Sequence, residues 1–222
     1  MRSSSAERRS ASDTATVGAA GEGSTDAPLP TALVVRIVDR LGAPIAGRAI
    51  TPSVNGGGSV SPATVTTASD GSARLTWTLG TIVGLPQEVS VTAGSFTAYF
   101  HASALPGAPA LVRKVAGDGQ TWYIGTSVPI APSVQVTDAY GNAVAAVAVT
   151  FVPTNSTVTG AEQVTSPSGI ATVGAWTLGG VDGAASLTAT VPVAGASTTF
   201  SGTAQSSSPP VTVSVTGPRV QA

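Results

Sequence analysis

One stretch of this chain returns far along the sequence with its residue types in the same order. The segment VRIVDRLG at 35–42 returns as VQVTDAYG at 134–141, a shift of 99 positions, and WTLG at 77–80 returns at 176–179 with the same shift. Two separate matches at one long spacing predict a tandem of two similar domains of about 100 residues each. A feature that both copies share is expected to belong to the fold, and a feature of one copy marks a loop difference or a special function.

The composition favours strands and makes several partners unsuitable. Aromatic residues are 5% of the 222 residues and apolar residues are 42%. Val, Ala, Thr, Ser and Gly supply most of the chain, and β-branched side chains pack well on a pleated, half-buried surface. Because charged residues are 9% and the net charge is −1, neither nucleic acid nor an anionic membrane is expected as a partner. The absence of cysteine excludes disulfides, thiolate metal sites and cysteine nucleophiles.

No segment has the pattern of a membrane anchor or a secretory signal. The longest nearly apolar run, 143–152, is too short to cross a bilayer. The first 30 residues lack the apolar region of a signal peptide. We therefore expect no membrane insertion by this chain. Export is specified elsewhere, or the chain is a fragment or has a misplaced start, or it is not exported by that route.

Changes in composition along the chain divide it into segments. Residues 1–28 are expected to be disordered or a linker, 29–104 to form the first domain and 105–204 the second. A stiff Pro-rich connector at 103–110 joins the two domains. Residues 205–222 are interpreted as a Ser/Pro linker followed by a lone strand-like tail.

Two tryptophans recur and are predicted to lie in the two cores. Ala73, Leu75 and Trp77 alternate with polar residues, as in a strand with one buried face. The second copy has one extra residue before Trp176, which would turn this side chain to solvent. A β-bulge at 174–175 is therefore predicted to return Trp176 to the core.

The repeated Asp and Gly are predicted to shape a turn. Asp39 and Asp138 each end a strand, where a carboxylate can accept backbone N–H groups, and Gly42 and Gly141 can supply a positive φ. Return strands are expected at 45–50 and from 143 to 151. The alternative, a calcium site, needs about six to eight oxygen ligands, and the eleven acidic residues form no dense cluster.

Many short strands with frequent turns predict antiparallel β-sandwiches. The further expected strands are 88–93, 95–102, 185–191 and 196–204. The string V-x-V-x-D-x-x-G-x-x-(V/I)-A, followed by G-x-A and WTLG, resembles the bacterial immunoglobulin-like repeats of group 1, the invasin/intimin type. The segment GDGQT at 117–121 resembles the opening of such a repeat, and GEGST at 21–25 is its counterpart in the first copy.

This resemblance covers most of the chain and implies an all-β fold of two tandem immunoglobulin-like antiparallel β-sandwiches. In that family such domains serve as rod segments of cell-surface or other extracellular proteins. Binding there usually belongs to a separate tip domain, and no such domain is visible in this sequence.

No residue pattern predicts catalysis, a cofactor or a metal. His101 is the only histidine, and Ser201 stands at its place in the other copy, so a strand residue is favoured over a Ser-His-Asp triad. The glycines at 56–58 lack the Lys-Ser/Thr of a phosphate-binding loop. We therefore predict that the chain is not an enzyme.

Trp122 and Tyr123 do not recur, which makes them the candidate binding residues. Packing at the joint between the domains is the favoured interpretation, and an exposed platform for sugar stacking is the sharper alternative.

The predicted function is a non-enzymatic spacer or stalk module of a bacterial extracellular or cell-surface protein, associated with adhesion. Its expected partners are neighbouring domains of a larger surface protein or assembly. One alternative is a module that binds a glycan or host protein through loops at the end of a sandwich. Another is a filament or virion subunit that donates its C-terminal strand to a neighbour.

Overall fold

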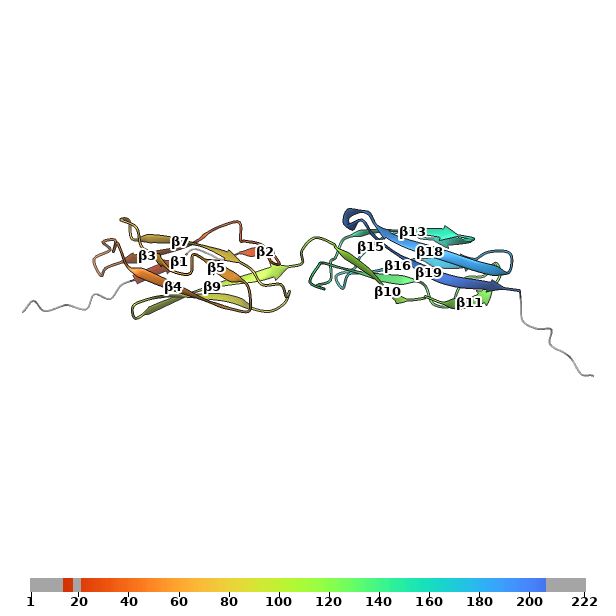
Figure 1. Cartoon of the computed structure of the whole chain (residues 1–222), viewed down its shortest axis with the longest axis horizontal. Helices are drawn as coiled ribbons and strands as arrows, with labels where there is room; N and C mark the ends of the chain where they lie inside the picture. Colours follow the sequence, from red (N-terminus) through yellow and green to blue (C-terminus); the bar gives the residue numbers. More distant parts are fainter. Residues whose placement is uncertain (1–13, 18–20, 207–222) are drawn as a thin grey trace, which may run out of the picture. The chain divides into compact units, whose positions relative to one another are not determined.

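The computed structural model describes residues 14–17 and 21–206, which fold into two compact units (Figure 1). The first unit extends to Gly107 and includes Asp138–Asn142, and the second takes 108–137 and the chain from Ala143 onward. Apart from a short 3₁₀ turn, η1 (Pro192–Ala194), every element in the described ranges is a strand. No helix within these ranges is long and apolar enough to cross a membrane.

The first unit consists of two sheets. The four-stranded sheet has the order β1 (Thr14–Val17), β3 (Leu33–Val38), β7 (Ser72–Thr78), β5 (Ser59–Ser61). The five-stranded sheet has the order β2 (Glu22–Ser24), β9 (Phe96–Leu105), β8 (Gln87–Ala93), β4 (Ala49–Asn55), β6 (Val65–Thr66). The strands pair antiparallel except for β2 and β9, which are parallel.

The second unit repeats this arrangement. On one side lie β10 (Leu111–Ala116), β12 (Ser133–Thr137) and β16 (Ile170–Thr172), together with the pair β14 (Ser156–Thr159) and β17 (Ala175–Leu178). The five-stranded sheet has the order β11 (Gln120–Tyr123), β19 (Ala196–Gln205), β18 (Gly183–Val191), β13 (Ala148–Thr154), β15 (Glu162–Val164). Here β11 and β19 are the parallel pair. The predicted fold class, two tandem antiparallel β-sandwiches, is confirmed.

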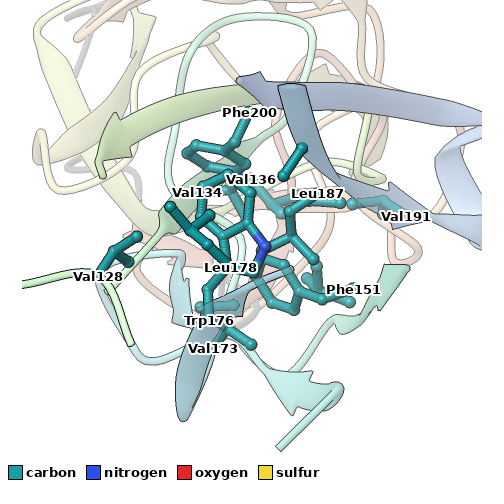
Figure 2. Close-up of a cluster of buried hydrophobic side chains, with 14 of the residues drawn as sticks. Val128, Val134, Val136, Phe151, Val173, Trp176, Leu178, Leu187, Val191 and Phe200 are labelled. Atoms are coloured by element: carbon teal, nitrogen blue, oxygen red, sulfur yellow. The ribbon is translucent and has the colours of Figure 1, made fainter. Parts of the chain in front are cut away.

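Each unit has its own core built from the inward faces of its strands. Trp77 in the first unit and Trp176 in the second are completely buried, as predicted. Figure 2 shows Trp176 among Phe151, Leu187 and Phe200, which come from β13, β18 and β19. Burial of these apolar side chains is the main favourable term for a domain that contains no disulfide.

The extra residue before Trp176 is absorbed where the strand is interrupted. β16 ends at Thr172 and β17 begins at Ala175, and both Val173 and Trp176 are at most 1% exposed. The Gly174 N–H donates to the Thr159 carbonyl at 3.0 Å. The change in alternation therefore falls between Val173 and Trp176 and returns the indole to the core.

The return strands begin later than predicted, at Ala49 and Ala148. The chain first has to cross from the sheet of β3 to the sheet of β4, and from that of β12 to that of β13. Gly47 and Ala146 lie in these crossings with φ of 72° and 60°. Their N–H groups donate to the carbonyl oxygens of Thr67 and Thr165. The apolar residues before them therefore belong to the crossing and not to the ladders of β4 and β13.

The expectation of disorder or a linker through residue 28 is wrong for the short strands β1 and β2. β1 pairs with β3, and β2 pairs with β9. Both are strands because they pair with distant parts of the chain, and the small residues of this region, which lack periodicity, do not indicate that pairing. β9 also continues through Leu105, which reduces the connector to 106–110. The strand-like tail predicted at 211–215 lies outside the described residues, and the remaining domain limits stay predictions.

Candidate functional site

The repeated Asp shapes the same turn in both copies. The Asp39 Oδ1 accepts the N–H groups of Leu41 at 2.8 Å and Ala43 at 2.9 Å. The Asp138 Oδ1 accepts those of Tyr140 and Asn142, both at 2.9 Å. The glycine within each turn, Gly42 or Gly141, has φ of 83° or 90°, a conformation that is unfavourable for other residues.

Asp138 is buried, unlike Asp39, and its second oxygen is also bonded. Its residue exposure is 1%. Within the first unit, Oδ2 accepts the Asn142 Nδ2 at 2.8 Å, the Gly107 N–H at 3.0 Å and the Thr25 Oγ1 at 3.2 Å. Burial raises the pKa of Asp138, but the hydrogen bonds from Asn142, Gly107 and Tyr140 outweigh burial and hold this pKa below its usual range. The carboxylate therefore stays ionised and is occupied by protein donors.

Two further aspartates, Asp70 and Asp182, also accept hydrogen bonds from groups of the protein. Asp70 accepts the Ser72 hydroxyl at 2.7 Å and the Ser72 N–H at 2.9 Å, and these bonds lower the pKa of Asp70. Asp182 accepts the Ser206 hydroxyl at 2.6 Å. Across residues 14–17 and 21–206, no three or more His, Asp or Glu residues come close enough together to hold a metal ion.

Trp122 and Tyr123 lie on β11, and each is partly exposed. Their ring centroids are 5.1 Å apart with the planes inclined by 46°. Trp122 packs against the core of the second unit, and the parallel register places Trp122 opposite Ala204 and Tyr123 opposite Gln205. Trp122 thus fastens β11 to its own core. Its role at a joint between domains and its role as a sugar platform both stay predictions.

The two buried tryptophans differ in how their indole N–H is bonded. The Trp176 Nε1 donates to the Ser156 Oγ at 2.8 Å, whereas the Trp77 Nε1 is buried without a partner in the described part of the chain. In the strand register Val60 lies opposite Trp77 and Val158 opposite Trp176, so Gly58 takes the place of Ser156. A side chain at Gly58 would lie 2.2 Å from the Thr78 carbonyl oxygen, which excludes a serine there.

The outward side of the five-stranded sheet in the first unit carries an exposed aromatic ring. Tyr99 on β9 is 53% exposed, and the small residues Ser90 and Ser53 lie beside it on β8 and β4. The adjacent row consists of His101, Glu88 and Asn55 on the same strands. We call these six residues the Tyr99 face.

His101 joins this face to a hollow in the surface. The His101 imidazole lies 3.6 Å from the Glu88 carboxylate, and the histidine side chain is 71% exposed. The hollow has a volume of about 510 Å³ and is lined by Glu22, Gln87, His101 and Ser103 together with the loop 84–86 and parts of β2 and β9. The Gln87 side chain is buried, and its Oε1 accepts the Gly80 N–H at 2.7 Å. From the sequence, His101 is expected to be an isolated strand residue. The signal that could have found this site is the difference between the copies, because the first has His101 where the second has Ser201.

Likeness to solved structures agrees with the observed architecture. No protein-family model and no curated protein matches the chain. The chain is similar to the Escherichia coli adhesin FdeC, with 22% identity and a TM-score of 0.54 over 86% of this chain and 63% of the FdeC chain. It is also similar to InvD of Yersinia pseudotuberculosis, with 19% identity and a TM-score of 0.48 over 90% of this chain and 59% of InvD. For the D00–D0 domains of intimin the identity is 13% and the TM-score 0.45, over 86% of this chain and all of theirs.

The likeness to FdeC shows the fold, a bacterial immunoglobulin-like sandwich of the type that the repeats resemble in sequence. The chain spans less than two thirds of the FdeC structure that it matches.

Proposed function

We propose that this chain is a non-enzymatic spacer or stalk module of a bacterial extracellular or cell-surface protein that takes part in adhesion. Two units of one fold, the shared fold with an adhesin and the invasin/intimin-type motifs support this function. Its partners would be neighbouring domains of the same surface protein. The chain's low content of charged residues, 9%, suits an exposed segment that should not attract charged partners indiscriminately.

The observation that carries the proposal is the parallel pairing at the ends of each unit. In the second unit β11, near the start, pairs in parallel with β19, the last strand. The Gly119 N–H donates to the Ser201 carbonyl oxygen, and the Ile124 N–H donates to the Gln205 carbonyl oxygen, both at 2.9 Å. The first unit has the same arrangement in β2 and β9, extended by the Thr25 N–H, which donates to Leu105.

Such a pair resists stretching because its two strands run parallel to each other. When the two chain ends are pulled apart, the start of β11 and the end of β19 move in opposite directions along the strands. The hydrogen bonds between them are then sheared together rather than opened one after another. A stalk under tension needs this property.

The experiment is single-molecule stretching of the second unit in two directions. Because the chain has no cysteine, cysteines introduced at chosen positions give unique attachment points. Pulling the chain through its termini shears the pair, whereas pulling the Thr126→Cys, Ser206→Cys variant loads the same end of β11 and β19 and opens the pair stepwise. We expect clearly lower unfolding forces in the second geometry, and equal forces in both would contradict the proposed stalk mechanism. The same double variant pulled through its termini is the control for destabilisation.

A further inference from the structure

The Tyr99 face has a different chemistry from the matching face of the second unit. The buried pairs Val89–Phe100 and Leu187–Phe200 align the two sheets. In that alignment the second unit has Val152, Thr188 and Thr199 in place of Ser53, Ser90 and Tyr99. It has Thr154, Ser186 and Ser201 in place of Asn55, Glu88 and His101. Both units fold in the same way, so the fold does not require an aromatic ring, an imidazole or an amide at these positions.

Tyr99 contributes little to the core. The inward residue next to it, Phe100, is 2% exposed, whereas Tyr99 is 53% exposed on the opposite side of β9. The serines beside the ring are too small to cover it. An uncovered aromatic ring among short polar groups offers a flat apolar surface with hydrogen-bonding groups at its edge, which is characteristic of a binding surface.

The groups around the ring define the kind of ligand. Glu88 supplies an acceptor, Asn55 both donors and acceptors, and His101 and the serines can do either. The Tyr99 face contains no lysine or arginine, so an anionic ligand would meet no cation of fixed charge. A neutral sugar ring is complementary to such a surface, because its C–H groups can lie on an aromatic ring while its hydroxyls bond the polar groups at the edge.

The hollow beside His101 extends this surface. Its volume of about 510 Å³ lies within the range of ligand pockets, and its polar lining groups Glu22 and Ser103 continue the same chemistry. We propose that the Tyr99 face binds a neutral oligosaccharide, with one sugar residue on Tyr99 and a neighbouring residue in the hollow. This inference is independent of the stalk function, because it uses the outward side of the sheet and not the parallel pair.

The test applies the full chain to a printed array of neutral and sialylated oligosaccharides. The decisive variant is Tyr99→Thr, which gives the first unit the residue that the second unit has at 199. Tyr99→Phe keeps the ring, and Thr199→Ala alters the matching place of the second unit. We expect the unchanged chain to bind a subset of neutral oligosaccharides, with affinity at least about tenfold lower in Tyr99→Thr and close to unchanged in the other two variants.

Denaturant unfolding of Tyr99→Thr, with a midpoint equal to that of the unchanged chain, separates lost binding from lost folding. If this variant is destabilised, His101→Ser is the second variant, and we expect it to weaken binding as well. The proposal is overturned if the unchanged chain binds no oligosaccharide, if it binds only sialylated ones, or if Tyr99→Thr binds as tightly as the unchanged chain.

Discussion

At the scale of single residues, the two copies act as controls for each other. Ser156 gives the buried Trp176 indole a hydrogen-bond acceptor, and the first copy has Gly58 at that place. Asp138 accepts hydrogen bonds from Gly107 and Asn142 as well as from its own turn, whereas among the described residues its counterpart Asp39 accepts them from its own turn. The recurring Trp and Asp residues therefore contribute differently to the stability of the two units. Substitutions can measure this difference in the free energy of unfolding.

Replacing Ser156 with Ala is expected to destabilise the second unit by about 1–2 kcal/mol. The substitution leaves the buried Trp176 N–H without a partner, and an unsatisfied buried donor costs that much. Urea unfolding followed by hydrogen exchange of β17 measures the loss. Thr157→Ala is the control, because Thr157 is exposed on the same strand. Equal stability of the Ser156→Ala and Thr157→Ala variants would show that the indole bond contributes nothing.

Replacing Asp138 with Asn is expected to destabilise the first unit by about 2 kcal/mol at pH 7. The folded pKa of Asp138 lies below its unfolded value of about 3.9. Its contribution is therefore fully present above that unfolded value and is lost as the pH falls through the folded pKa. Asp138→Asn should accordingly lose less stability between pH 5 and pH 2 than the unchanged protein does.

Urea midpoints across this pH range, with hydrogen exchange of β3 and β7, measure the effect in the first unit. Asp39→Asn is the control, because it removes the carboxylate of the matching turn, which accepts the N–H groups of Leu41 and Ala43 within that turn. An identical pH dependence in Asp138→Asn and the unchanged protein would refute the role assigned to the buried carboxylate.

At the scale of elements, close packing of β19 against β17 depends on a residue without a side chain. Gly202 on β19 is buried, and a Cβ there would lie 2.7 Å from the Trp176 ring and 3.1 Å from Leu178. The same strand pairs with β11 and β18, so it cannot move away without disturbing both ladders.

Gly202→Ala is therefore expected to destabilise the second unit by about 1–3 kcal/mol through overpacking. Its unfolding midpoint in urea is the measurement. Gly180→Ala is a matched control, because no atom lies within 4 Å of its added Cβ and its φ is not positive. If both variants unfold at the same midpoint, β19 has more freedom against Trp176 than its contacts indicate.

At the scale of the whole molecule, the remaining question is whether the chain associates with itself. The described residues form two units with separate cores, and the stalk function requires no copy of the chain as a partner. The alternative of strand donation assigns assembly to residues after Gln205.

Light scattering after size-exclusion chromatography is expected to show monomers for the full chain and for a version ending at Gln205. Strand donation to a neighbour would instead give polymers that depend on concentration in the full chain alone. That result would replace the stalk proposal with an assembly subunit. The shortened version is the control for the full chain, because it lacks the residues after Gln205 and retains the described residues up to that point.

The sequence alone determined the fold class and the core tryptophans. Regular alternation makes burial a local property, so Trp77 and Trp176 could be assigned to the interior, and the recurring Asp–Gly spacing identified a turn that its own residues close. Strand limits near crossings could not be predicted, because Ile45 and Val144 are apolar whether they lie in a ladder or before it.

Only the tertiary structure decided which distant residues meet. The parallel pairing of β11 with β19 joins segments that carry no mark of each other in the sequence. The burial of Asp138, the Trp77 N–H that has no acceptor among the described residues, and the arrangement of His101 with Glu88 and Tyr99 likewise depend on register between strands. Alternation and turns arise from neighbouring residues, whereas register arises from packing of the whole unit, and this is why the candidate binding site became visible only in the folded chain.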